Sequence, residues 1–158
     1  MGIIGSTIKP FTATAFKAGE DFYDVSEKDI DGKWAVFFFY PADWTFVCPT
    51  ELEDLGEKYE MLQSMGVEVF AVSTDTHFSH KAWHDNSEKI GKLNFPFLGD
   101  QMHILSNNFG VLREGVGLAD RATFVVDPDG VIQIMELTSE GVGRNANKQT
   151  RKITAPQN

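Results

Sequence analysis

The chain has a single cysteine, Cys48, in the segment YPADWTFVCPT at residues 40–50. A lone cysteine is more often a small buried residue than a reactive one. This cysteine, however, follows an apolar run and precedes Pro49, which suits the first turn of a helix. The unpaired N–H groups and the dipole of a helix start favour an anion and lower the pKa of a thiol. Because the thiolate is the nucleophilic form, this position predicts a reactive Cys48.

Three nearby residues could share a pocket with the cysteine. Thr45 lies three positions before it and can both donate and accept a hydrogen bond. Pro41 can form a wall of the pocket without offering an N–H group. Glu51 lies three positions after the cysteine and resembles the acid of a capping arrangement. For Glu51, a carboxylate that complements the helix dipole is at least as good an interpretation as a catalytic one.

The elements around this loop follow from hydrophobic patterns. The run WAVFFFY at residues 34–40 is typical of a central strand buried on both faces, and Pro41 ends it. Apolar residues at helical spacing then predict a helix from about Pro49 to Gly66. We expect the remaining elements to be a hairpin at 16–25, a strand at 67–72, a helix at 77–88, a strand at 95–98, a short helix at 101–109, strands at 122–126 and 131–137, and a last helix from Asn145.

The order of these elements predicts the fold class. Strands alternate with helices before a terminal hairpin, whose turn is the segment DPDG at residues 127–130. This order favours an α/β fold with a central mixed β-sheet flanked by helices, and a thioredoxin-like arrangement fits it. A length of 158 residues suits one compact domain over residues 1–158.

Composition narrows the classes of partner. The net charge of −9 argues against nucleic acid and against an anionic membrane surface, since both attract basic proteins. The longest apolar run, at residues 34–40, is too short to span a bilayer, and no secretory signal is apparent. One cysteine cannot form an intrachain disulfide, so a cytoplasmic protein is expected. No glycine-rich nucleotide loop occurs, and we expect no cofactor.

Longer segments carry a family resemblance. The spacing Pro41-x3-Thr45-x2-Cys48 matches the active-site signature of the peroxiredoxins. The segments FFFYPADWTFVCPTELEDL, STDTHFSHKAWHD, GLADRATFVVDPDG and TSEGVGRN resemble typical two-cysteine peroxiredoxins, most closely the bacterial alkyl hydroperoxide reductases, over essentially the whole chain. The resemblance implies a thioredoxin-like fold and a thiol-dependent peroxidase. Hydrogen peroxide and organic hydroperoxides would be reduced as the Cys48 thiolate becomes a sulfenic acid.

The resemblance also implies roles for the other residues. Thr45 would hydrogen-bond the peroxide, and Pro41 would shield the sulfur. Arg121 matches the active-site arginine, whose fixed charge would stabilise the thiolate and the transition state. Without the resemblance, a surface ion pair between Arg121 and Asp120 would be the preferred interpretation.

Two further charged residues receive supporting roles. Glu51 is expected to orient Arg121 and Thr45 as a partner behind the site. Arg144, in the segment GVGRN, matches a second family arginine near the pocket.

The resemblance implies a homo-oligomer. Trp44 and Phe46 flank Thr45 and are expected to bury in a neighbouring subunit, because this region of the family helps to join dimers into a ring. A ring of five dimers is expected.

Family members of this type carry a second, resolving cysteine in a C-terminal arm, which does not occur up to Asn158. We expect this arm to be absent or truncated. The sequence could be a truncated form or the ordered part of one, a chain shortened by design or proteolysis, or a natural one-cysteine variant. With the arm, an intersubunit disulfide would form and be reduced by a disulfide reductase flavoprotein or a thioredoxin-like protein. Without it, an external thiol must resolve the sulfenic acid.

His77, His80 and His84 share one face of the helix expected at residues 77–88 and could together bind zinc or copper. The family carries the same histidine pattern without a catalytic metal, so no metal site is expected. Trp83 is expected to pack near the pocket or an interface.

Two other functions use the same residues. One is a ring-forming holdase chaperone or a peroxide sensor that works through Cys48. The other is a thioredoxin-like binding domain in which the cysteine is buried and inert. Replacing Cys48 with serine separates these from a peroxidase, because only the peroxidase must lose peroxide turnover.

Overall fold

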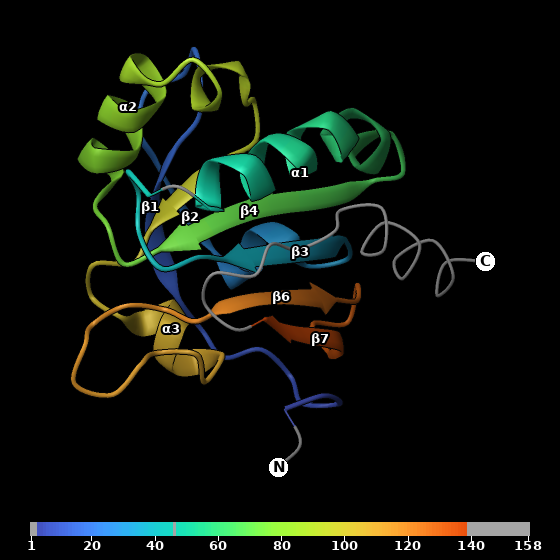
Figure 1. The fold of residues 1–158 in the computed structure, drawn as a ribbon. Helices are drawn as coiled ribbons and strands as arrows, with labels where there is room; N and C mark the ends of the chain where they lie inside the picture. Colours follow the sequence, from blue (N-terminus) through green and yellow to red (C-terminus); the bar gives the residue numbers. More distant parts are fainter. Residues whose placement is uncertain (1–2, 46, 139–158) are drawn as a thin grey trace.

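The computed structural model describes residues 3–45 and 47–138, with only the backbone described at residues 47–49 and 138. Within these residues seven strands form one mixed sheet in the order β2-β1-β5-β4-β3-β6-β7 (Figure 1). The strands are β1 (Thr12–Phe16), β2 (Tyr23–Ser26), β3 (Trp34–Phe39), β4 (Val67–Ser73), β5 (Phe97–Gly99), β6 (Arg121–Val126) and β7 (Ile132–Thr138). The helices are α1 (Val47–Ser64), α2 (His77–Asn86) and α3 (Ile104–Asn108), with short 3-10 turns η1 (Glu27–Ile30) and η2 (Ile90–Lys92).

The sheet lies between two layers of helix. α1 and α2 lie on one face, and α3 covers the other (Figure 1). Val36 and Phe38 of β3 pack into the cluster on the α1 side, whereas Phe37 and Phe39 pack into the cluster on the α3 side. Successive strand side chains point to opposite faces, so a continuous apolar run fills both layers. The prediction of a central strand buried on both faces is confirmed.

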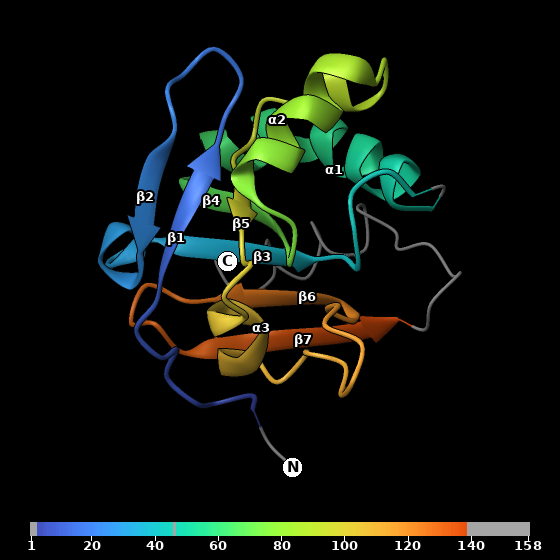
Figure 2. The same cartoon turned by 90° about the vertical axis from the view of Figure 1, so that its left-hand side faces the viewer.

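Pairing directions explain where the chemistry-bearing loop lies. β3, β4 and β5 are parallel, and β1 and β6 join this unit with antiparallel pairing. The β1–β2 hairpin lies at one edge and β7 at the other (Figure 2). Because Phe39 pairs with Ala122, the first residue of β6, Arg121, lies beside the carboxyl end of β3. The loop that leads to Cys48 begins at this same end.

Most predicted elements are confirmed, with shifted ends. α2 ends at Asn86 rather than at residue 88, and β5 begins at Phe97 rather than at residue 95. The helix expected at 101–109 begins only at Ile104, because His103 before it takes a left-handed φ of 63°. The last helix, expected from Asn145, lies outside the described residues.

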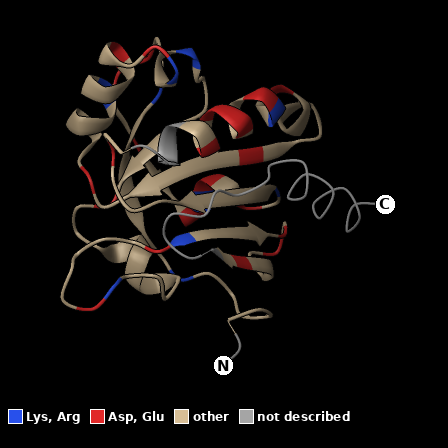
Figure 3. Cartoon of the chain, viewed as in Figure 1, with Lys and Arg blue, Asp and Glu red and all other residues tan. Residues whose placement is uncertain are grey.

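Acidic residues are concentrated on one of the long elements, α1. α1 contains five acidic residues and one lysine, so the ribbon of this helix is mostly acidic where it is charged (Figure 3). Such a face repels phosphate backbones, in line with the overall charge. No helix among the described residues has the length and apolarity needed to cross a bilayer.

Candidate active site

The loop between β3 and α1 carries the predicted site. Cys48 is the second residue of α1, so it lies in the first helical turn as predicted. Backbone N–H groups of a first turn have no partner within the helix, and together with the dipole they stabilise a thiolate. Pro41, at the start of the loop, is buried. The position of Cys48 therefore meets the electrostatic requirement for a nucleophilic thiol.

A buried ion pair lies close to this helix start. The Arg121 guanidinium, through its Nη1, donates to Oε1 of Glu51, and each residue is only 3% exposed. Glu51 lies three residues after Cys48 in α1, which is less than one turn along the helix. Glu51 thus holds the permanent positive charge of Arg121 against α1, the helix whose first turn contains Cys48. A carboxylate can orient Arg121 only if it contacts the guanidinium, and Glu51 makes this contact.

A surface ion pair between Arg121 and Asp120, the alternative suggested by the sequence, does not fit the structure well. Asp120 lies against Arg113, with Nε of Arg113 2.9 Å from Oδ1 of the aspartate. Arg121 points instead into the protein and contacts Glu51. Glu51 is buried together with Arg121, and its role in complementing the helix dipole stays an alternative interpretation.

Thr45 and Trp44 form the part of the loop just before α1. The Thr45 hydroxyl donates to the carbonyl oxygen of Ala42 at 3.2 Å, which leaves its lone pairs as acceptors. Trp44 has φ of 69°, a left-handed value that is uncommon for a bulky residue. The residue is 56% exposed, and its ring lies 6.4 Å from the ring of buried Trp83. Trp83 also packs on Tyr40 at 6.0 Å, so it does lie near the loop as expected.

Sequence reasoning missed the polar network behind the loop. The Asp43 carboxylate, 5% exposed, accepts from the Tyr40 hydroxyl at 2.5 Å and lies 2.8 Å from Nδ1 of His80. The Ser79 hydroxyl donates to the same carboxylate at 2.9 Å. An aspartate between an apolar strand and an aromatic segment is the one signal that could have suggested a buried polar centre.

The three histidines of α2 have separate surroundings rather than a common site. His80 lies between Asp43 and the carbonyl oxygen of Leu98, and Nε2 of His84 lies 3.2 Å from the carbonyl oxygen of Leu93. His77 packs against aromatic rings. In the part of the chain that the structure describes, no three His, Cys, Asp or Glu side chains are grouped to hold a metal ion.

Two residues named from the sequence have no structural description. Arg144 and Phe46 both lie outside the described residues. The role suggested for each stays a prediction.

Comparisons with known proteins agree on one family and fold. The model of the AhpC/TSA family matches residues 4–135. Alkyl hydroperoxide reductase C of Escherichia coli K12 is 59% identical over 157 residues, which cover 99% of this chain and 83% of that protein. The protein of the same name from Bacillus subtilis is 56% identical with the same coverage.

Solved structures show the same arrangement. The crystal structure of Enterococcus faecalis AhpC superposes with a TM-score of 0.96 at 48% identity, covering 99% of this chain and 93% of that one. The reduced 2-Cys peroxiredoxin of Plasmodium vivax gives a TM-score of 0.93 at 28% identity, covering 99% and 97%. The predicted thioredoxin-like α/β fold is confirmed.

Proposed function

Because the chain belongs to the AhpC/TSA family of peroxiredoxins, we propose that it is a thiol-dependent peroxidase. Its substrates are hydrogen peroxide and organic hydroperoxides. One observation carries the proposal: Cys48 lies in the first turn of α1, less than one turn before Glu51, whose buried carboxylate holds Arg121. The binding-domain alternative gives this buried ion pair no role, since such a pair adds little net stability over apolar residues of similar size.

The oxidative step needs only the thiolate and a proton. The Cys48 sulfur attacks the terminal oxygen of the hydroperoxide, an S–O bond forms and the O–O bond breaks. The sulfur is oxidised by two electrons to the sulfenic acid, and the departing alkoxide or hydroxide takes up a proton to leave as an alcohol or water. Arg121 stabilises the negative charge as it moves from the sulfur to the departing oxygen. Glu51 keeps the Arg121 guanidinium in place.

Thr45 and Pro41 shape the entrance to the sulfur. With its proton directed to the carbonyl oxygen of Ala42, the Thr45 hydroxyl offers a lone pair to the O–H of the peroxide. Buried Pro41 excludes water from one side without presenting an N–H group that would compete for the substrate. Arg144 is the second arginine proposed for this pocket.

The reductive half requires a second thiol. A resolving thiol condenses with the sulfenic acid and releases water, and a dithiol reductant then returns the disulfide to thiols. We assign this reductant to a disulfide reductase flavoprotein or a thioredoxin-like protein. The expected location is the cytoplasm, and the expected unit is one domain per chain.

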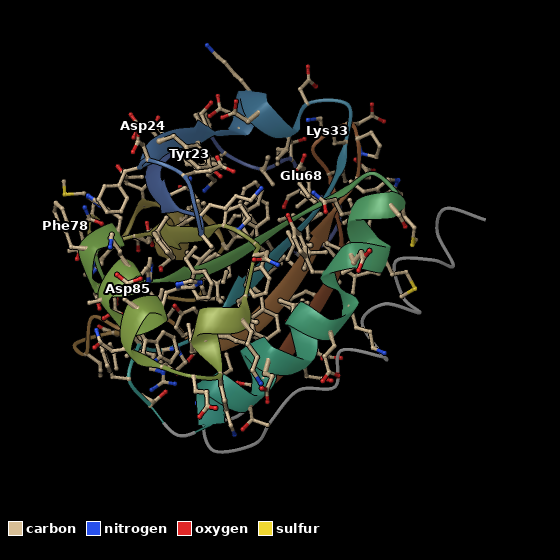
Figure 4. All side chains as sticks on the ribbon, turned by 90° about the horizontal axis from the view of Figure 1, so that it is seen from above. Tyr23, Asp24, Lys33, Glu68, Phe78 and Asp85 are labelled. Atoms are coloured by element: carbon tan, nitrogen blue, oxygen red, sulfur yellow. The ribbon has the colours of Figure 1, made fainter. Side chains whose placement is uncertain are left out.

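Exposed aromatic surface supports the proposed assembly into dimers and a ring of five dimers. Trp44, in the loop before α1, is 56% exposed, and Phe78, which is 65% exposed, lies on the outer side of α2 (Figure 4). Phe22 adjoins Phe78 with ring centroids 5.5 Å apart. Exposed aromatic side chains such as the neighbouring pair Phe22 and Phe78 are typical of a protein contact.

The test is peroxide consumption by the reduced chain with an added dithiol. Cys48→Ser should abolish turnover, and one equivalent of peroxide should add one oxygen to the mass of the wild type but not of the variant. Lys81→Ala serves as the control, because Lys81 is exposed on α2 and pairs only locally with Asp85. Turnover that survives in Cys48→Ser would refute the proposal.

A further inference from the structure

Asp43 is held on several sides although it belongs to a loop. Its two carboxylate oxygens contact Tyr40, directly after β3, and Ser79 and His80 in α2. Its backbone N–H donates to Oδ2 of Asp75 at 2.7 Å. Loops rarely bury a carboxylate, because an ionised group loses hydration there unless it is fully hydrogen-bonded. Asp43 has that full set of partners.

His80 supplies a charge-assisted contact to this carboxylate. Its Nε2 lies 2.9 Å from the carbonyl oxygen of Leu98, which can only accept, so Nε2 carries a proton. Its Nδ1 lies 2.8 Å from Oδ2 of Asp43, and a contact this short needs a proton between the two atoms. Asp43 also accepts from two hydroxyl groups, which stabilise its ionised form. The proton therefore belongs to His80, and the two residues form a buried imidazolium–carboxylate pair.

Tyr40 remains a donor to this pair at physiological pH. Burial raises the pKa of its phenol well above the usual value, and the neighbouring charge of Asp43 raises it further. The other charged group that faces the pair from a packed element is Asp75, which is tied to the Ser73 hydroxyl at 2.6 Å. On α2 itself, His77 and His84 have other surroundings.

The residue after Asp43 shows what the pair holds in place. Trp44 adopts its left-handed φ without the freedom of a glycine, and such a conformation persists only when its surroundings fix it. The neighbouring Thr45 closes the turn onto the carbonyl oxygen of Ala42. The anchored Asp43 lies inside this turn, between the acceptor and the donor. Its contacts therefore determine where the Thr45 hydroxyl lies.

We propose that His80, acting through Asp43, is a positioning residue for peroxide reduction, which fixes the loop at residues 41–45 against α2 and β5. The inference rests on the proposed peroxidase function. It assigns to α2 a role that the histidine pattern alone does not suggest, since His80 acts neither as a metal ligand nor by contact with the substrate.

Two substitutions of His80 separate positioning from stability. His80→Asn keeps an N–H group near the position of Nδ1 and so the contact with Asp43, but it loses the bond to Leu98. His80→Gln keeps the donor near Nε2 and the bond to Leu98, but it loses the contact with Asp43. The rate constant for reaction of reduced Cys48 with peroxide should fall about 10- to 100-fold in His80→Gln, the usual effect of a small misplacement. It should stay within about threefold of wild type in His80→Asn, the range expected when the orienting contact is kept.

A milder variant covers the case in which both His80 variants fail to fold. Ser79→Ala removes one donor to Asp43 from the half-buried edge of the network and should slow the reaction severalfold with the fold intact. Lys81→Ala, two positions further along α2, should leave the rate unchanged. Equal rates in Ser79→Ala and wild type would overturn the inference.

A spectroscopic readout is independent of activity. Nitrogen NMR of the His80 ring should show both nitrogens protonated at neutral pH, and Asp43→Asn should abolish that signature. A neutral ring in the wild type overturns the pair even if the enzyme is active.

If the wild type reduces no peroxide while the ring is doubly protonated, the proposed function fails and the pair stands. If the wild type is active but His80→Gln and His80→Asn are slowed in proportion to their losses of stability, the positioning role is wrong.

Discussion

Arg121 in β6 and Glu51 in α1, 70 positions apart in sequence, form a buried ion pair that joins the sheet to the helix whose first turn contains Cys48. A pair of this kind adds little net stability, because desolvation offsets the attraction between the charges. Removing one partner is different, since it leaves an uncompensated charge in the interior. The pair therefore serves mainly to fix the place and direction of a positive charge.

Two substitutions of Arg121 should separate the effect of its positive charge from the effect of its planar shape. Arg121→Lys keeps the charge but loses the planar fork, so we expect the reaction of Cys48 with peroxide to slow by about 10²-fold. Arg121→Met removes the cation that faces the buried Glu51 carboxylate and should lower the free energy of unfolding by about 3–5 kcal/mol. Stopped-flow rates and urea unfolding measure the two effects. The double variant Arg121→Met/Glu51→Leu should recover stability but not activity, and recovered activity would contradict the assignment.

The sequence predicts those parts of the site that depend on residues adjacent in the chain. The run before Pro41 indicates a buried strand, and the position of Cys48 before Pro49 indicates a helix start; both are confirmed. The α2 partners of Asp43 cannot be predicted in this way, because Ser79 and His80 follow it by 36 and 37 positions. Only the tertiary fold brings them together.

The choice of partner for Arg121 shows the same limit. Its neighbour Asp120 is the natural partner by proximity in sequence, but adjacent strand residues point to opposite sides. Asp120 meets Arg113 across a loop, and Arg121 turns inward to Glu51. The family resemblance, rather than the local pattern, gave the better prediction.

Asp100 accounts for a helix start that the sequence placed too early. Its carboxylate accepts from the backbone N–H groups of Leu105 and Ser106 at 2.9 and 2.8 Å, and from the Ser106 hydroxyl at 2.7 Å. Asp100→Ala would leave these buried donors without their acceptor and should cost about 1–3 kcal/mol of unfolding free energy. Thermal and urea unfolding measure the loss. Asp100→Asn keeps one acceptor oxygen and should lose less, so equal losses in the two variants would contradict this account.

Stability at alkaline pH should depend on Tyr23, which lies in the β1–β2 hairpin (Figure 4). Burial, with smaller contributions led by Glu20, raises the pKa of its phenol to about 12. A raised pKa in the folded state means that the stabilisation is complete below pH 10 and is lost as pH rises through about 12. Tyr23→Phe cannot titrate, so its unfolding free energy should fall less steeply over this interval. Identical slopes for wild type and variant in urea titrations would show that the phenol is not linked to folding.

Gly99, the last residue of β5, should tolerate no side chain because α2 begins directly against it. A Cβ there would lie 2.8 Å from the backbone nitrogen of His77 and 3.2 Å from the carbonyl carbon of Thr76, and backbone atoms cannot move aside as side-chain ends do. Gly99→Ala should therefore push the start of α2 away and cost about 1–3 kcal/mol, the usual range for overpacking. Because the first turn of α2 would be displaced, its backbone amide groups should also exchange faster with solvent. Gly19→Ala is the control: its φ of 78° makes it a strained site too, but its surroundings are open. It should lose stability without altering exchange in α2, and the same exchange pattern in both variants would show that the close approach at Gly99 does not set the position of the helix.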